Sequence, residues 1–86
     1  MDANSISQTA LMLIAENCPR ALYAYVICHI NCDENLFIHI SRRIIDEKSL
    51  SWTRFHNDIK SLARQGLLEW CYEDDGLSIT LAEYEL

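Results

Sequence analysis

The side chains best suited to recognise another molecule lie in residues 51–66. At about 100° per residue, this segment places apolar side chains on one face of a helix and hydrogen-bond donors on the other. The donor face carries Thr53, Arg54, Asn57, Lys60, Ser61 and Arg64. Arg and Asn pair with base edges in the major groove, and basic side chains contact phosphates. The pattern therefore leaves three interpretations open: a solvated helix face, a face that contacts nucleic acid, and a face that contacts a protein.

Within this face we assign the roles by side-chain chemistry. Arg54, Asn57 and Ser61 are expected to read bases, with Thr53 beside them, while Lys60 and Arg64 hold phosphates. Arg42 and Arg43, a few residues earlier, are expected to add phosphate contacts.

The charge distribution along the chain favours the same segment. The 86 residues contain 7 Lys and Arg against 13 Asp and Glu, a formal charge of −6. Residues 41–66 contain six basic and three acidic residues, whereas the remaining residues contain one basic and ten acidic. Positive charge is thus concentrated where a DNA-binding protein would need it, although the net charge weakens non-specific DNA affinity.

A cluster of carboxylates supports a different function. The cluster consists of Glu69, Glu73, Asp74 and Asp75. These side chains would be repelled by DNA phosphates, and they could instead bind a basic protein partner. An acidic protein-interaction module, such as an inhibitor or adaptor, is therefore the alternative function. Asp is also favoured in turns for its own local hydrogen bonding, without any partner.

The sequence contains little that suggests catalysis or a cofactor. Cys28 and Cys32 would share a helix face and could supply two metal ligands, but a structural zinc site needs four. We expect buried cysteines, no metal and no cofactor. A glycine-rich phosphate loop, an HExxH motif and a GxSxG motif are all lacking. We therefore expect no enzymatic activity and no small-molecule substrate.

Composition indicates a folded cytoplasmic protein. Half of the residues are apolar and 23% are charged, which is typical of a globular domain. The apolar run 21–28 is far shorter than the roughly 20 residues that cross a bilayer, and Met1–Asn4 lack the positive charge of an export signal. We expect reduced cysteines and no membrane partner.

The periodicity predicts helices before the donor-bearing segment. A helix over 5–17 would be capped by Ser5 or Ser7, and a second over 19–31 would begin at Pro19. Residues 36–40 favour a strand followed by a helix over 42–47, capped by Ser41; one helix over 35–47 is the alternative.

A hairpin is expected to follow. Ser51 would cap a helix over 52–65, which Gly66 would end. Asp75-Gly76 is typical of a type I′ turn, which would join strands 67–72 and 77–82 and place Tyr72 opposite Ile79. Trp70 would then lie opposite Leu81. We expect the core, rather than a set of stacking platforms, to contain Trp52, Phe55, Trp70 and Tyr72. Residues 83–86 are expected to form an acidic tail.

The helix over 19–31 is apolar nearly all round, which suggests a homodimer. Tyr23 and Tyr25 lie almost opposite each other on this helix, so both cannot face one core. We expect a homodimer through the N-terminal helices, with Leu13, Tyr23 and Tyr25 at the interface.

This order of elements resembles the winged helix-turn-helix superfamily. The resemblance lies in Ser41–Ile45, Leu50–Arg54, Ile59–Glu69 and Leu77–Leu81, and the segment "IKSLARQGLLEW" looks like the end of a recognition helix running into a wing strand. It implies a mainly α fold with a C-terminal β-hairpin (α+β), in a single domain over 1–86. Residues 5–17 would be an added helix, 19–66 the helical core and 67–82 the wing. It also implies a transcriptional regulator with helix 52–65 in the major groove, although the acidic turn departs from the usual basic wing.

Overall fold

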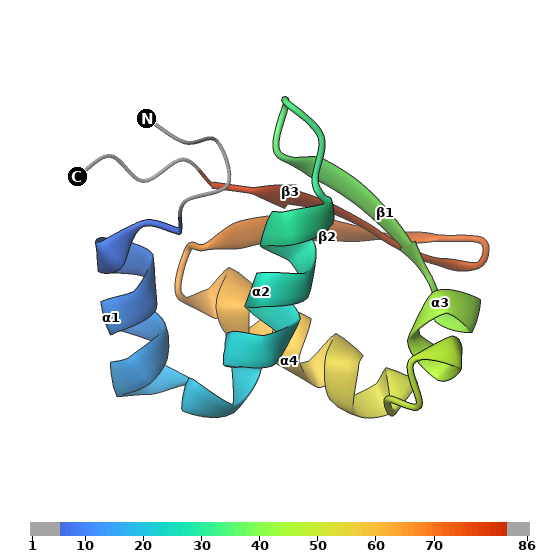
Figure 1. Cartoon of the computed structure of the whole chain (residues 1–86), viewed down its shortest axis with the longest axis horizontal. Helices are drawn as coiled ribbons and strands as arrows, with labels where there is room; N and C mark the ends of the chain where they lie inside the picture. Colours follow the sequence, from blue (N-terminus) through green and yellow to red (C-terminus); the bar gives the residue numbers. More distant parts are fainter. Residues whose placement is uncertain (1–5, 83–86) are drawn as a thin grey trace.

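The computed structural model describes residues 6–82, which form an α+β fold with four α-helices and a three-stranded antiparallel sheet (Figure 1). In chain order the elements are α1 (Gln8–Asn17), the 3₁₀ turn η1 (Pro19–Ala21), α2 (Leu22–Asn31), β1 (Phe37–Ser41), α3 (Arg42–Glu47), α4 (Trp52–Arg64), β2 (Leu68–Glu73) and β3 (Gly76–Leu81). The expected strand before the helix over 42–47 is confirmed, and the alternative single helix over 35–47 is wrong.

Serine side chains begin three of the helices. The Oγ atoms of Ser7, Ser41 and Ser51 accept hydrogen bonds from backbone amides three residues later, at 3.4, 3.2 and 3.2 Å. Ser5, the other expected cap of α1, lies outside the described residues, as does the tail over 83–86. Gly66 follows α4 and has a positive φ of 74°. This conformation ends many helices, and glycine adopts it without strain.

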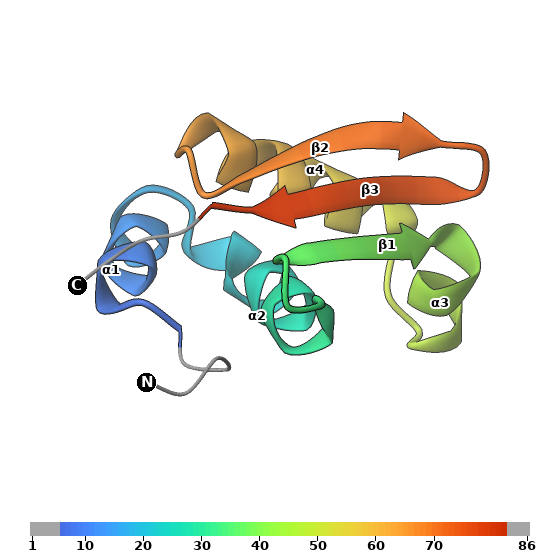
Figure 2. The ribbon, with the colours of Figure 1, turned by 90° about the horizontal axis from the view of Figure 1, so that it is seen from above.

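The sheet covers one side of the helices. Its strand order is β1-β3-β2, so β3 is central and pairs with both neighbours. The helices lie on one face of the sheet (Figure 1), and the view from above shows the other face free of helices (Figure 2). The core lies between these layers, where Ile40, Leu77 and Ile79 of the sheet are buried together with Phe55 and Ile59 of α4.

The hairpin has a different register from the one expected. Glu73 pairs with Gly76, so Asp74 and Asp75 form the turn and Trp70 lies opposite Ile79. Neither aspartate has the positive φ that a type I′ turn requires. A Cβ at position 76 would lie 1.9 Å from the carbonyl oxygen of Ile40, so the glycine is needed where β1 approaches β3.

The register error is two residues, and it leaves the faces of the hairpin unchanged. Tyr72 lies opposite Leu77, and Leu68 lies opposite Leu81. The side chains of Trp70 and Tyr72 therefore still point to the side of the sheet on which α4 packs, and Glu69 and Glu73 point to the other side.

The two tyrosines of α2 separate as their spacing predicts. The ring of Tyr25 is 3% exposed and lies in the core, whereas Tyr23 is 60% exposed. Leu13 is half-buried against the core. Of the residues expected at a dimer interface, Tyr23 is thus the one that the single chain leaves on the surface.

In the part of the chain that the structure describes, no helix is long and apolar enough to cross a membrane.

Candidate nucleic-acid interface

The exposed face of α4 carries the donor side chains in the arrangement predicted from the sequence. Phe55, Ile59 and Leu62 are buried against the core, and the six donors lie on the solvent side. Thr53, Arg54, Asn57 and Arg64 are exposed, while Lys60 and Ser61 are half-buried. The Ser61 hydroxyl donates to the backbone oxygen of Asn57 at 3.2 Å, so this donor is already used within the helix.

Arg42 and Arg43 lie apart from this row, at the start of α3. The backbone amide of Arg42 donates to the carbonyl oxygen of Asp75 at 2.8 Å, which fixes the start of α3 beside the hairpin turn. The Arg43 guanidinium lies 3.4 Å from the Glu47 carboxylate, with both side chains largely exposed. The two arginines thus form a second basic position beside acidic groups rather than an extension of the α4 face.

A pocket of about 200 Å³ lies along one flank of α4. Its lining residues are Arg20, Tyr23, Ala24, Leu50, Ser51, Arg54, Phe55 and Asp58. Burial raises the pKa of the Asp58 carboxyl, and the nearby Arg54 and Arg20 guanidiniums partly offset this effect. Two guanidiniums from different elements therefore border one pocket and outnumber the Asp58 carboxylate that also lines it, so they could hold a phosphate there.

Sequence reasoning missed Arg20. It is the one basic residue outside 41–66, and counting charge along the chain placed it among the acidic remainder. The signal that could have found it is Pro19, which begins the short turn that packs against α4. This turn brings Arg20 to the same pocket as Arg54.

The opposite flank of α4 meets β2 through aromatic rings. The His56 ring contacts those of Trp70 and Tyr72 edge-on, with centroid separations of 5.0 and 5.4 Å. Trp70 and Tyr72 are also perpendicular, with centroids 5.0 Å apart. Phe55 is buried and Trp70 is half-buried, but Tyr72 is 67% exposed, so the expectation that Tyr72 belongs to the core is wrong. The ring meets α4 through His56 near the end of β2, and most of the residue stays open to solvent.

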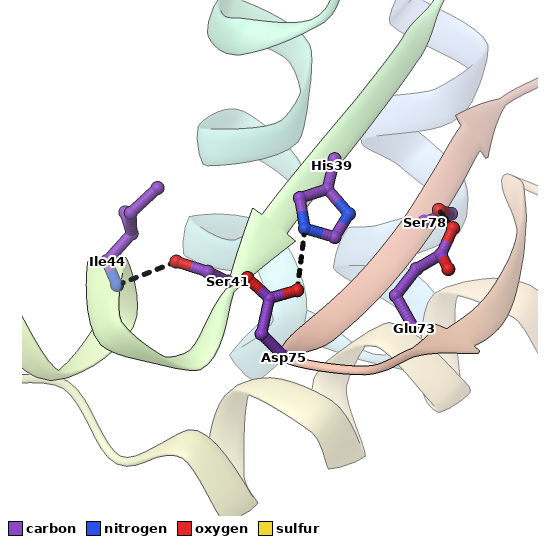
Figure 3. A network of polar contacts seen from close by, with 6 residues as sticks. All are labelled: His39, Ser41, Ile44, Glu73, Asp75 and Ser78. Atoms are coloured by element: carbon purple, nitrogen blue, oxygen red, sulfur yellow. Dashed lines mark hydrogen bonds and ion pairs between the residues drawn. The ribbon is translucent and has the colours of Figure 1, made fainter.

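The four carboxylates of the hairpin do not act as one group. Glu73 accepts a hydrogen bond from Ser78, and Asp75 lies 3.0 Å from Nε2 of His39 on β1 (Figure 3). Glu69 and Asp74 are exposed. Because Glu69 and Glu73 point away from the sheet face that packs on α4, phosphates bound along α4 would not meet these two side chains directly.

The cysteines show no arrangement suited to metal binding. Burial raises the pKa of the Cys28 thiol to about 12, and Cys32 Sγ donates to the backbone oxygen of His29 at 3.2 Å. Between residues 6 and 82, no group of three or more His, Cys, Asp or Glu side chains could hold a metal ion. Cys28 therefore behaves as a core residue.

Comparisons with protein families, with curated proteins and with solved structures found no match for this chain.

Proposed function

We propose that this protein is a winged-helix DNA-binding regulator that places α4 in the major groove of duplex DNA. The order α2, β1, α3, α4 and the β2–β3 hairpin supports this proposal, because it is the order of elements that the superfamily resemblance implies. An α-helix fits the major groove, where base edges carry a distinct pattern for each pair.

The observation that carries the proposal is the separation of charge between two faces. The outer face of α4 presents Arg54, Lys60 and Arg64 without an exposed carboxylate between them. The strand carboxylates Glu69 and Glu73 lie on the other side of the sheet. A molecule with a net charge of −6 can therefore still offer a locally basic surface to phosphates.

Within the proposed complex, contacts divide by position on the helix. Thr53 and Asn57 lie at the centre of the exposed face and are suited to reach base edges, as is Arg54 at its flank. Phosphates on the pocket side would be held by Arg20 together with Arg54. Lys60 and Arg64 would hold phosphates along the helix, and Arg42 and Arg43 would add contacts near the turn.

Binding to duplex DNA at two salt concentrations tests the proposal. With about six phosphate contacts, affinity should fall roughly a thousandfold between about 50 and about 200 mM salt. Replacing Lys60 and Arg64 together (Lys60→Gln, Arg64→Gln) should lower the slope of log affinity against log salt by about two. The measurement is fluorescence anisotropy with a pool of random-sequence duplexes.

Lys48→Gln serves as the control. Lys48 is exposed at the end of α3 and lies outside the proposed interface, so this variant should keep the full salt slope. Absence of binding at low salt, or an equal slope in all variants, would contradict the proposal.

A second candidate function rests on the outer sheet face. Glu69 and Glu73 lie there beside the exposed turn of Asp74 and Asp75, so a basic protein could bind this face without touching α4. For such a partner, Asp74→Ala with Asp75→Ala would weaken binding and the Lys60 and Arg64 changes would not. The DNA proposal expects the reverse ranking.

The proposal also places the protein in the cytoplasm. All four cysteines are free thiols in the structure, as expected in a reducing compartment.

A further inference from the structure

The three rings of His56, Trp70 and Tyr72 form an aromatic cluster on the hairpin side of α4. Each pair meets edge-on, with interplanar angles of 81–90°. Trp52 lies against the same histidine, 6.2 Å between centroids. Mutual contact of this kind fixes the position of all the rings, because each edge packs on the face of a neighbour.

Tyr72 is the outermost ring of this cluster. It is 67% exposed, although its neighbours Trp70 and His56 are half-buried. A large aromatic side chain that is held in place and yet open to solvent offers a flat surface with little conformational entropy left to lose on binding. In this respect it differs from a partly exposed core residue.

The charge beside the cluster indicates what would stack on Tyr72. Lys60 follows His56 by four residues on α4, so the two side chains are neighbours on the helix surface, and the other side of the His56 ring meets Tyr72. A planar ring joined to a phosphate would meet both an aromatic surface and a cation there. Single-stranded nucleic acid is recognised by this combination of stacking and positive charge.

We propose that Tyr72 is a stacking platform for one unpaired nucleobase of the DNA bound along α4. This inference rests on the proposed function and adds a substrate class, namely duplex DNA that carries a bulged or otherwise unpaired nucleotide. Trp70 and His56 are positioning residues that hold the Tyr72 ring, and Lys60 neutralises a phosphate next to the stacked base.

Three DNA probes separate this inference from duplex binding in general. They are a paired duplex of about two helical turns, the same duplex with one unpaired thymidine, and the same duplex in which the unpaired nucleotide is abasic. The last two share the backbone and differ in one base. Fluorescence anisotropy should give about tenfold tighter binding to the thymidine bulge than to the abasic bulge, as expected for one stacked base.

Two variants of the tyrosine and one control assign the effect. Tyr72→Ala should remove the difference between the two bulges, and Tyr72→Phe should keep it, because stacking needs the ring and not the hydroxyl. Phe37→Ala removes another exposed aromatic side chain, on the opposite face of the sheet, and should keep the difference. Circular dichroism confirms that each variant is folded.

Each outcome bears on one proposal or on both. Equal affinity for the two bulges, or a difference that survives in Tyr72→Ala, would overturn the stacking platform while duplex binding stands. Absence of binding to all three probes would overturn the proposed function and the platform with it.

Discussion

At the scale of single residues, the aromatic cluster buries a polar atom of His56. Its Nε2 atom is buried and has no hydrogen-bond partner among the described residues. Burial, and then the nearby Lys60 ammonium, lower the pKa of the His56 imidazole. The folded chain therefore keeps this histidine neutral at pH values where the unfolded chain would take up a proton.

This shift predicts a dependence of stability on pH. The unfolded histidine titrates near pH 6.5, and the folded pKa is lower, so the contribution of His56 is fully present above about pH 6.5 and is lost as the pH falls from there toward the folded pKa. Urea unfolding across this range should show the loss, with a slope of at most about 1.4 kcal/mol per pH unit. His56→Phe should remove this component; an unchanged slope in that variant would contradict the assignment.

Some residues of the candidate site could not be found from sequence because their role depends on tertiary contacts. The donor face of α4 could be predicted, since helical spacing alone separates Asn57 from Phe55. Arg20 joins this face because Pro19 starts a turn that packs on α4. Arg20 and Arg54 therefore line one pocket although they are 34 residues apart in the chain. Tyr72 alternates correctly toward the helices and contacts His56 of α4, but most of the residue stays open to solvent near the end of β2.

At the scale of elements, the helix starts were predictable and the hairpin register was not. Ser41 and Ser51 cap the helices that follow them through local hydrogen bonds, which a local sequence pattern can specify. Gly76 looked like a turn residue, but its position is set by Ile40 on a strand distant in sequence. Local turn chemistry was outweighed by the packing of β1 against β3.

The two glycines of this region should therefore respond differently to substitution. Gly76→Ala should destabilise the fold by about 3 kcal/mol, because the added Cβ would collide with the Ile40 backbone. Gly66→Ala should cost about 1 kcal/mol, for its positive φ. Asn tolerates that conformation, so Gly66→Asn should recover part of the loss, whereas Gly76→Asn should not. Chemical unfolding measures all four, and recovery at both positions would contradict the steric role of Gly76.

At the scale of the whole molecule, the apolar surface left by the single chain is uneven. Leu22, Tyr23 and Ile30 are exposed within an arc of about 100° on α2, with exposed fractions of 41%, 60% and 63%. Met12 on α1 is also largely exposed. Ile44 is exposed as well, but it lies on α3, at one end of the molecule and apart from α2 (Figure 1). The surface suited to a second copy is therefore the α2 arc, with Tyr23 at its edge beside the Arg20–Arg54 pocket and Tyr25 in the core behind it.

We predict that the protein is a homodimer through this arc of α2. Ile30→Glu should convert the dimer to a monomer, since a carboxylate would be buried at the interface. Ile44→Glu makes the same chemical change elsewhere and should leave the dimer intact. Sedimentation equilibrium distinguishes these states, and a monomeric wild type or an equal effect of both variants would contradict the prediction.

A two-fold dimer that reads DNA needs its two α4 helices about 34 Å apart, so Ile30→Glu should also weaken binding to duplexes long enough for both helices. On a duplex that fits one helix, the wild type and Ile30→Glu should bind alike, because the α4 face itself is unchanged.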